Sequence, residues 1–94
     1  MIDMYVNKNR EIAFRVIEGQ AVILTPANGM LHTLSLVATR IFELANGKRK
    51  ISEICNGIVE EFDAEEDVVA RDARRFIEDM LHKKILVLSE SKSA

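Results

Sequence analysis

The chain has 94 residues, which suffice for one small domain and leave no room for a second. Its 13 Lys and Arg residues and 15 Asp and Glu residues give a formal net charge of −2, which argues against nucleic-acid binding through bulk positive charge. A hydrophobic share of 48% excludes a largely disordered chain. The single cysteine excludes an internal disulfide framework and a multi-thiolate zinc site.

The two ends of the chain are polar. Residues 1–11 mix charged and polar side chains without an apolar signal core, so we interpret them as an N-terminal extension. Residues 12–88 then form the domain, and residues 89–94 a flexible tail. No apolar run approaches the roughly 20 residues that span a bilayer. We therefore expect a cytoplasmic protein without membrane contact.

The first half of the domain has the composition of β-strands. Residues 12–17 and 21–25 are rich in β-branched and apolar residues, and Glu18-Gly19-Gln20 between them has turn chemistry. Pro26-Ala27-Asn28-Gly29 is a second turn. A short third strand over residues 30–34 then completes a three-stranded antiparallel meander.

From Ser35 onward the apolar spacing changes to that of helices. Ser35 is an N-cap for a first helix that ends at Asn46-Gly47. The second helix carries a stripe of apolar residues from Ile51 to Phe62, and the third opens at Asp63 with Glu66 as its capping-box partner. Residues 85–88 form a short closing strand.

These elements predict an α+β, winged-helix-like fold, in which a three-stranded antiparallel sheet is followed by a three-helix bundle. The residues expected to be largely buried in one cluster are Leu34, Phe42, Ile54, Ile58, Phe62 and Phe76.

The polar residues do not form a catalytic pattern. Cys55 lies on the apolar stripe of the second helix, so we expect a buried packing residue. His32 and His82 have no metal ligand at helical or hairpin spacing, and the acids of residues 63–67 fit a helix N-terminus better than a calcium loop. We expect no enzyme activity, no catalytic residue, no metal and no cofactor.

Three arginines share one side of the predicted third helix. At about 100° per residue, Arg71, Arg74 and Arg75 cluster with Glu78 and His82. This face is either a solvated surface with partial ion pairing or a binding face for an acidic peptide or for DNA phosphates. A second basic run, residues 48–50, is interpreted as an exposed turn between helices.

An ordered set of short motifs resembles the PqqD family. It consists of Leu34-Ser35-x-x-Ala38-x-x-Ile41-Phe42-Glu43-Leu44, Asn46-Gly47, Ile51-Ser52-Glu53-Ile54, Glu61-Phe62-Asp63, Asp72, Phe76-Ile77, Leu81 and Ile85-Leu86. The resemblance covers residues 14–88. Where this chain has Ser35, family members usually have Asn or Asp. They often have Thr in place of Lys50 and commonly Gly in place of Lys84. Because Lys cannot accept a hydrogen bond, we expect the cap at residue 50 to be lost.

The resemblance implies a function. PqqD-like domains, also called RiPP recognition elements, are non-catalytic adaptors. They bind the leader segment of a ribosomally synthesised precursor peptide and present it to a modifying enzyme, often a radical SAM protein. The peptide adds as a strand beside the third strand and rests against the third helix. The implied partners are the precursor peptide and the modifying enzyme. The protein itself is then a monomer or weak homodimer that needs no nucleic acid.

The residues expected to bind the peptide are Leu31, His32 and Thr33 on the third strand and Arg71, Arg74 and Arg75 on the third helix. Alternation places Met30, His32 and Leu34 on one face of that strand and Leu31 and Thr33 on the other. Which shoulder of the helix borders the peptide stays open. Two alternatives also stay open, namely a winged-helix DNA-binding protein and a simple interaction or dimerisation domain.

Overall fold

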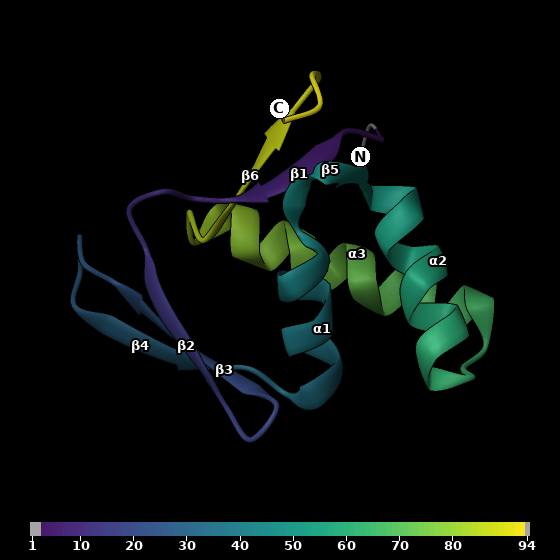
Figure 1. Ribbon diagram of the computed structural model, residues 1–94, viewed down its shortest axis with the longest axis horizontal. Coiled ribbons are helices and arrows are strands. Elements are labelled where there is room, and N and C mark those ends of the chain that lie inside the picture. Colours follow the sequence, from purple (N-terminus) through teal and green to yellow (C-terminus); the bar gives the residue numbers. More distant parts are fainter. Residues whose placement is uncertain (1–2, 94) are drawn as a thin grey trace.

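The computed structural model describes residues 3–93, which form two three-stranded sheets and three helices (Figure 1). In chain order the elements are β1 (Tyr5–Lys8), β2 (Ala13–Ile17), β3 (Gln20–Thr25), β4 (Met30–Thr33), α1 (Leu36–Leu44), β5 (Asn46–Lys50), α2 (Ile51–Phe62), α3 (Glu66–His82) and β6 (Leu86–Ser89). The predicted α+β fold, with a three-stranded antiparallel sheet followed by three helices, is confirmed.

The predicted meander is the β2-β3-β4 sheet. Ile17 pairs with Gln20 across a two-residue turn in which Glu18 and Gly19 both have positive φ angles, of 51° and 81°. Positive φ at both central positions defines a type I′ turn, whose twist matches that of antiparallel strands. The turn therefore sets the register of β2 against β3.

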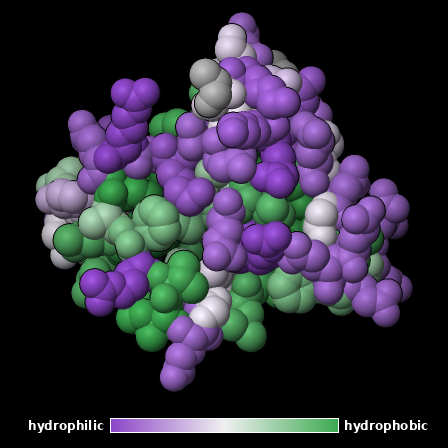
Figure 2. All heavy atoms as spheres, viewed as in Figure 1, coloured by the Kyte–Doolittle hydropathy of each residue, from purple (hydrophilic) through white to green (hydrophobic). Residues whose placement is uncertain are grey.

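The helices cover one face of this sheet. Ala21 and Ile23 of β3 are completely buried, and the Ala21 N–H donates to the buried Thr39 Oγ1 of α1 at 2.8 Å. Phe14 of β2 packs edge-on against Phe42 of α1, with ring centroids 4.9 Å apart. These contacts attach α1 to the sheet. Figure 2 shows hydrophobic side chains gathered over the part of the surface that this sheet forms. The exposed apolar side chains of its strands include Ile17, Leu24 and Leu31.

A second sheet, with strand order β5-β1-β6, was not predicted. Residues 1–11 were expected to be an extension, yet β1 is the central strand of this sheet and Val6 is completely buried. Residues 46–50 were expected to be a helix end and a turn, and they form β5. The expected closing strand exists as β6, but it pairs with β1 and not with the meander.

The predicted flexible tail is also corrected. Ser89 belongs to β6, and the Ser93 N–H donates to the Gly47 carbonyl at 2.8 Å. This bond ties the tail to β5. Residues 1, 2 and 94, which complete the two predicted terminal segments, lie outside the described residues.

Two of the three predicted helix starts are confirmed. The Ala38 N–H donates to the Ser35 Oγ at 3.1 Å, so Ser35 caps α1, and α2 begins at Ile51. The third is wrong, because α3 begins at Glu66. Asp63 instead ends α2 in a left-handed conformation, with φ of 46°. A residue in that conformation cannot also cap the following helix in the extended geometry that an N-cap requires.

The core lies between the two sheets and the three helices. Four of the residues expected there are buried, namely Leu34, Phe42, Ile54 and Ile58. Phe76 packs against them while partly exposed, and Phe62 is 41% exposed, so its assignment to the core is wrong. Cys55 is buried, as predicted. Within residues 3–93, no helix combines the length and apolar character needed to cross a membrane.

Candidate functional site

Strand β4 has one unpaired side. Among the described residues it pairs with β3 alone, so it forms an edge of the β2-β3-β4 sheet. The Leu34 N–H, just beyond β4, donates to the Ala21 carbonyl at 2.9 Å. In an antiparallel strand, the backbone groups of alternate residues point to opposite sides. The groups of His32 therefore point to β3, and those of Leu31 and Thr33 point to the free edge.

The side chains of β4 alternate as predicted. Leu31 is 67% exposed and Thr33 is also exposed, on the sheet face that the helices do not cover. His32 is partly buried on the opposite face, where its Nε2 lies 3.5 Å from Thr25 Oγ1. Of the three predicted strand residues, Leu31 and Thr33 thus offer free backbone groups. His32 contributes its side chain to the interior of the sheet.

Two surface hollows show how α3 lies relative to β4. One has a volume of about 470 Å³ and is lined by Ser35 and Val37, which follow β4, together with Asp72 and Phe76 of α3. The other has a volume of about 600 Å³ and is lined by residues 25–28, which precede β4, together with residues 82–84. The start of β4 therefore lies near the end of α3 and its end near the first turns of α3.

The shoulder of α3 that borders β4 carries Asp72, Phe76, Asp79 and Lys83. Helical spacing places these residues on one side, and each of them except Asp79 lines one of the two hollows. Asp79 lines a third hollow with Asp72, Arg75 and Phe76. We call the surface between this shoulder and the free edge of β4 the β4–α3 groove.

The three predicted arginines share the outer side of α3, but they lie at different distances from the groove. Arg75 lies at the border of the β4–α3 groove. Arg71 is exposed and contacts Asp72, with 3.3 Å between Nε and Oδ1. Arg74 lies on the other shoulder, near α2, where its charge helps to lower the pKa of the Asp3 carboxyl and opposes the rise in the pKa of the Cys55 thiol. Only Arg75 therefore remains a candidate for direct peptide contact.

The chemistry of the described residues is that of a binding surface. Within residues 3–93, no three His, Cys, Asp or Glu side chains are placed to hold a metal ion. Burial raises the pKa of the Cys55 thiol, which disfavours the nucleophilic thiolate. The free strand edge and the apolar hollow beside Phe76 are features that recognise an extended peptide.

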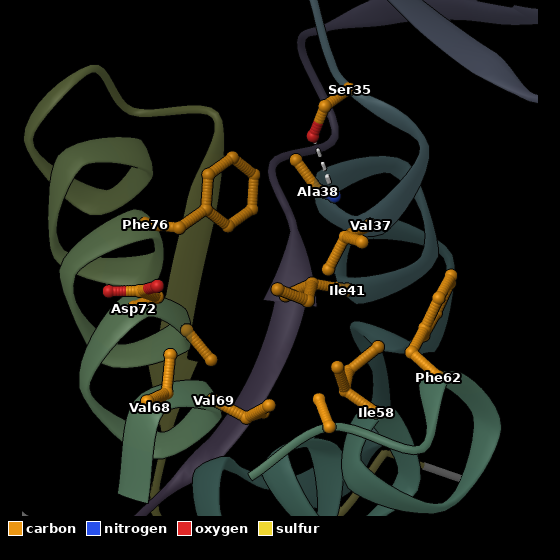
Figure 3. Close-up of a pocket in the computed structure, with 12 residues that line it drawn as sticks. Ser35, Val37, Ala38, Ile41, Ile58, Phe62, Val68, Val69, Asp72 and Phe76 are labelled. Atoms are coloured by element: carbon orange, nitrogen blue, oxygen red, sulfur yellow. Dashed lines mark hydrogen bonds between the residues drawn. The ribbon is translucent and has the colours of Figure 1, made fainter.

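Sequence reasoning missed the apolar part of this surface. Val37, Phe62 and Val68 are between 39% and 41% exposed and line the same hollow as Phe76 (Figure 3). Phe62 ends the apolar stripe of α2 and was therefore assigned to the core. Val68 lies beside the inner face of α3. An apolar residue such as Val68, which lies outside the buried face of its helix, could have indicated an exposed apolar site.

Comparison with known proteins gives concordant matches. The family model described as coenzyme PQQ synthesis protein D (PqqD) matches residues 20–86, from the start of β3 to the start of β6. A PqqA binding protein from Rhizobium meliloti (strain 1021) is 29% identical over 70 residues, which cover 74% of this chain and 69% of that protein. The solved structure of TbiB1 in complex with the TbiA(beta) leader peptide matches with a TM-score of 0.77 at 28% identity, covering 85% of this chain and 93% of that one.

Proposed function

This chain belongs to the PqqD family, and we propose that it is a non-catalytic adaptor that captures the leader segment of a ribosomally synthesised precursor peptide. The leader adds as a strand to the free edge of β4 and lies in the β4–α3 groove. The adaptor then presents the peptide to a modifying enzyme, for which a radical SAM protein is the leading candidate. It acts in the cytoplasm as a monomer or weak homodimer.

The observation that carries this proposal is the free edge at Leu31 and Thr33. Each residue offers an outward N–H and an outward carbonyl, and an incoming strand can pair with all four groups. Main-chain pairing of this kind supplies affinity with little dependence on side chains, while adjacent pockets select the sequence. An adaptor that handles an extended leader needs both elements, and both lie beside α3.

The named relatives support the same function. The Rhizobium meliloti relative is named for binding PqqA, and the solved structure that matches this chain holds a leader peptide. Both matches extend over most of this chain. The DNA-binding alternative has less support, because exposed carboxylates such as Asp72 and Glu78 lie among the arginines of α3 and the chain has a net charge of −2.

The first experiment uses a random dodecapeptide display library as the probe. Peptides that the wild-type protein selects are synthesised, and their affinity is measured for the wild type and for Thr33→Pro. Proline removes the outward donor at residue 33 without removing a bond to β3, so we expect about tenfold weaker binding or more. Thermal unfolding of the variant confirms that it is folded.

The matched control is Val16→Pro on β2, the opposite edge of the same sheet. By the alternation that starts from the Ile17–Gln20 pair, the backbone groups of Val16 also point to a free edge. We expect this variant to bind the selected peptides with unchanged affinity. Equal losses in the two variants, or none in Thr33→Pro, would show that the peptide does not add to β4.

A further inference from the structure

An apolar hollow lies beyond the end of β4. Its walls come from three helices, with Val37 from α1, Phe62 from α2 and Val68 and Phe76 from α3 (Figure 3). Its volume of about 470 Å³ lies within the range of about 300–1,000 Å³ that is usual for ligand pockets. We call it the helix pocket.

The helix pocket leaves a large apolar surface in water. Val37, Phe62 and Val68 are 40%, 41% and 39% exposed around a floor formed by the buried Ile41, Ile58 and Val69. A contiguous exposed patch of large apolar side chains is typical of an interaction site. An occupant that fills this pocket must therefore present a bulky aliphatic or aromatic side chain.

The rim of the helix pocket is acidic. Asp63 and Glu65 flank the pocket residue Ala64, Asp67 precedes Val68, and Asp72 lines the pocket itself. Within residues 3–93, Asp63, Glu65 and Asp67 form no ion pair with a basic side chain. Glu61 differs, because Arg40 binds its carboxylate at 2.8 Å. The unpaired carboxylates favour an occupant that carries positive charge.

We infer that the helix pocket anchors one bulky apolar side chain of the same precursor peptide, and that Lys or Arg residues flank this side chain. This inference rests on the proposed function. It also reverses the expectation of an acidic peptide that the arginines of α3 had suggested, because the carboxylates and not the arginines surround the pocket.

The position of the anchor within the peptide follows from the fold. Ser35, two residues after the end of β4, lines the helix pocket. Every strand pair of the β2-β3-β4 sheet is antiparallel, and an added strand that continues this pattern has its N-terminal end near Thr33. The anchor side chain and its basic neighbours therefore lie on the N-terminal side of the paired segment.

The test examines which peptides are selected from the random dodecapeptide library and how two charge variants bind them. We expect the selected peptides to share an aromatic or aliphatic residue next to Lys or Arg, on the N-terminal side of a β-forming segment. The variant Glu65→Gln/Asp67→Asn should bind the consensus peptide about three- to tenfold more weakly at low salt, with a smaller loss at high salt. Phe62→Ser should bind about tenfold more weakly at either salt concentration.

The matched control is Glu78→Gln/Glu90→Gln, which removes the same charge from the outer side of α3 and from the C-terminal segment. It should bind like the wild type. Selected peptides without basic residues, or equal affinities of the two double variants, would overturn the inference.

Amide shift mapping separates this inference from the proposed function. If residues 30–34 respond to the consensus peptide while Val37, Ala64 and Val68 are silent, the pocket inference is wrong and strand addition stands. If residues 30–34 are silent as well, both are wrong.

Discussion

Asp3 caps helix α2 by binding Ser52, which lies 49 residues later in the sequence. Its carboxylate accepts hydrogen bonds from the Ser52 backbone N–H at 3.0 Å and from the Ser52 hydroxyl at 2.7 Å. Lys50, at the N-cap position, supplies no side-chain cap, although its backbone N–H donates to Glu53 at 2.9 Å. The cap that Lys50 cannot provide is thus supplied by the segment before β1.

This relationship makes the stability depend on pH. Hydrogen bonds from Ser52 lower the pKa of Asp3 in the folded protein. Because the pKa of Asp3 is lower in the folded protein, its ionised carboxylate stabilises the fold. This contribution is complete above the pKa of the unfolded chain, about 3.9, and is lost as pH falls through the pKa of the folded protein. We expect Asp3→Ala to destabilise the protein by about 1 kcal/mol near neutral pH, a modest value because Asp3 is exposed.

Urea unfolding of the wild type and of Asp3→Ala, from neutral to acidic pH, measures how the unfolding free energy depends on this cap. The difference in unfolding free energy should shrink as pH falls below the unfolded pKa of about 3.9, because the carboxylate then becomes protonated. A difference that does not change with pH below that value would show that the ionised carboxylate is not the capping group.

Lys84 occupies a position that suits glycine. Its φ angle is 60°, and its N–H donates to the Leu81 carbonyl at 3.1 Å just after α3 ends. Left-handed geometry costs a residue with a side chain about 1–2 kcal/mol, and glycine avoids this cost. Glycine also makes the unfolded chain more flexible, which cancels part of the gain in stability. We expect Lys84→Gly to raise the unfolding free energy by roughly 0.5–1 kcal/mol.

Lys83→Gly is the matched control for Lys84→Gly. Lys83 has an ordinary φ of −82° and pairs with Asp79 at 2.9 Å. Glycine at this position should destabilise the protein by up to about 1 kcal/mol. A thermal melt in which both variants lose stability would contradict this interpretation of Lys84.

Ile58 and Phe62 lie one turn apart on α2, with very different burial. Ile58 is 1% exposed and Phe62 is 41% exposed. Ile58→Ala should cost about 2–5 kcal/mol, because it leaves a cavity in a packed core. Phe62→Ala should cost clearly less, because much of its ring already contacts water. Chemical denaturation of both variants checks this order, and equal costs would show that Phe62 is a core residue.

The predicted parts of the fold are those whose patterns are local. The meander follows from strands rich in β-branched and apolar residues and from the turn chemistry of Glu18-Gly19-Gln20, and α2 follows from its apolar stripe. Strand β1 has one completely buried residue, Val6, and β5 has the sequence Asn-Gly-Lys-Arg-Lys. Neither segment resembles a strand by itself, since both depend on partners that are distant in the sequence.

The candidate site divides in the same way. Leu31, His32 and Thr33 were predicted from the short third strand and the family resemblance, and the structure leaves this edge of β4 unpaired within residues 3–93. The shoulder of α3 that faces β4 depends on how α1 and α2 set the rotation of that helix, which no spacing within α3 specifies. The arginines were therefore predicted to bind the peptide, whereas the structure places Asp72 and Phe76 at the groove.

The most direct test of the account is amide hydrogen exchange of β4, measured by NMR with and without a saturating selected dodecapeptide. In the free protein the amides of Leu31 and Thr33 should exchange fast, because they point away from β3, while Leu34 is protected by its bond to Ala21. Strand addition should slow the exchange of Leu31 and Thr33 selectively. If both amides exchange equally fast with the peptide bound, the peptide does not pair with β4 and the central claim is wrong.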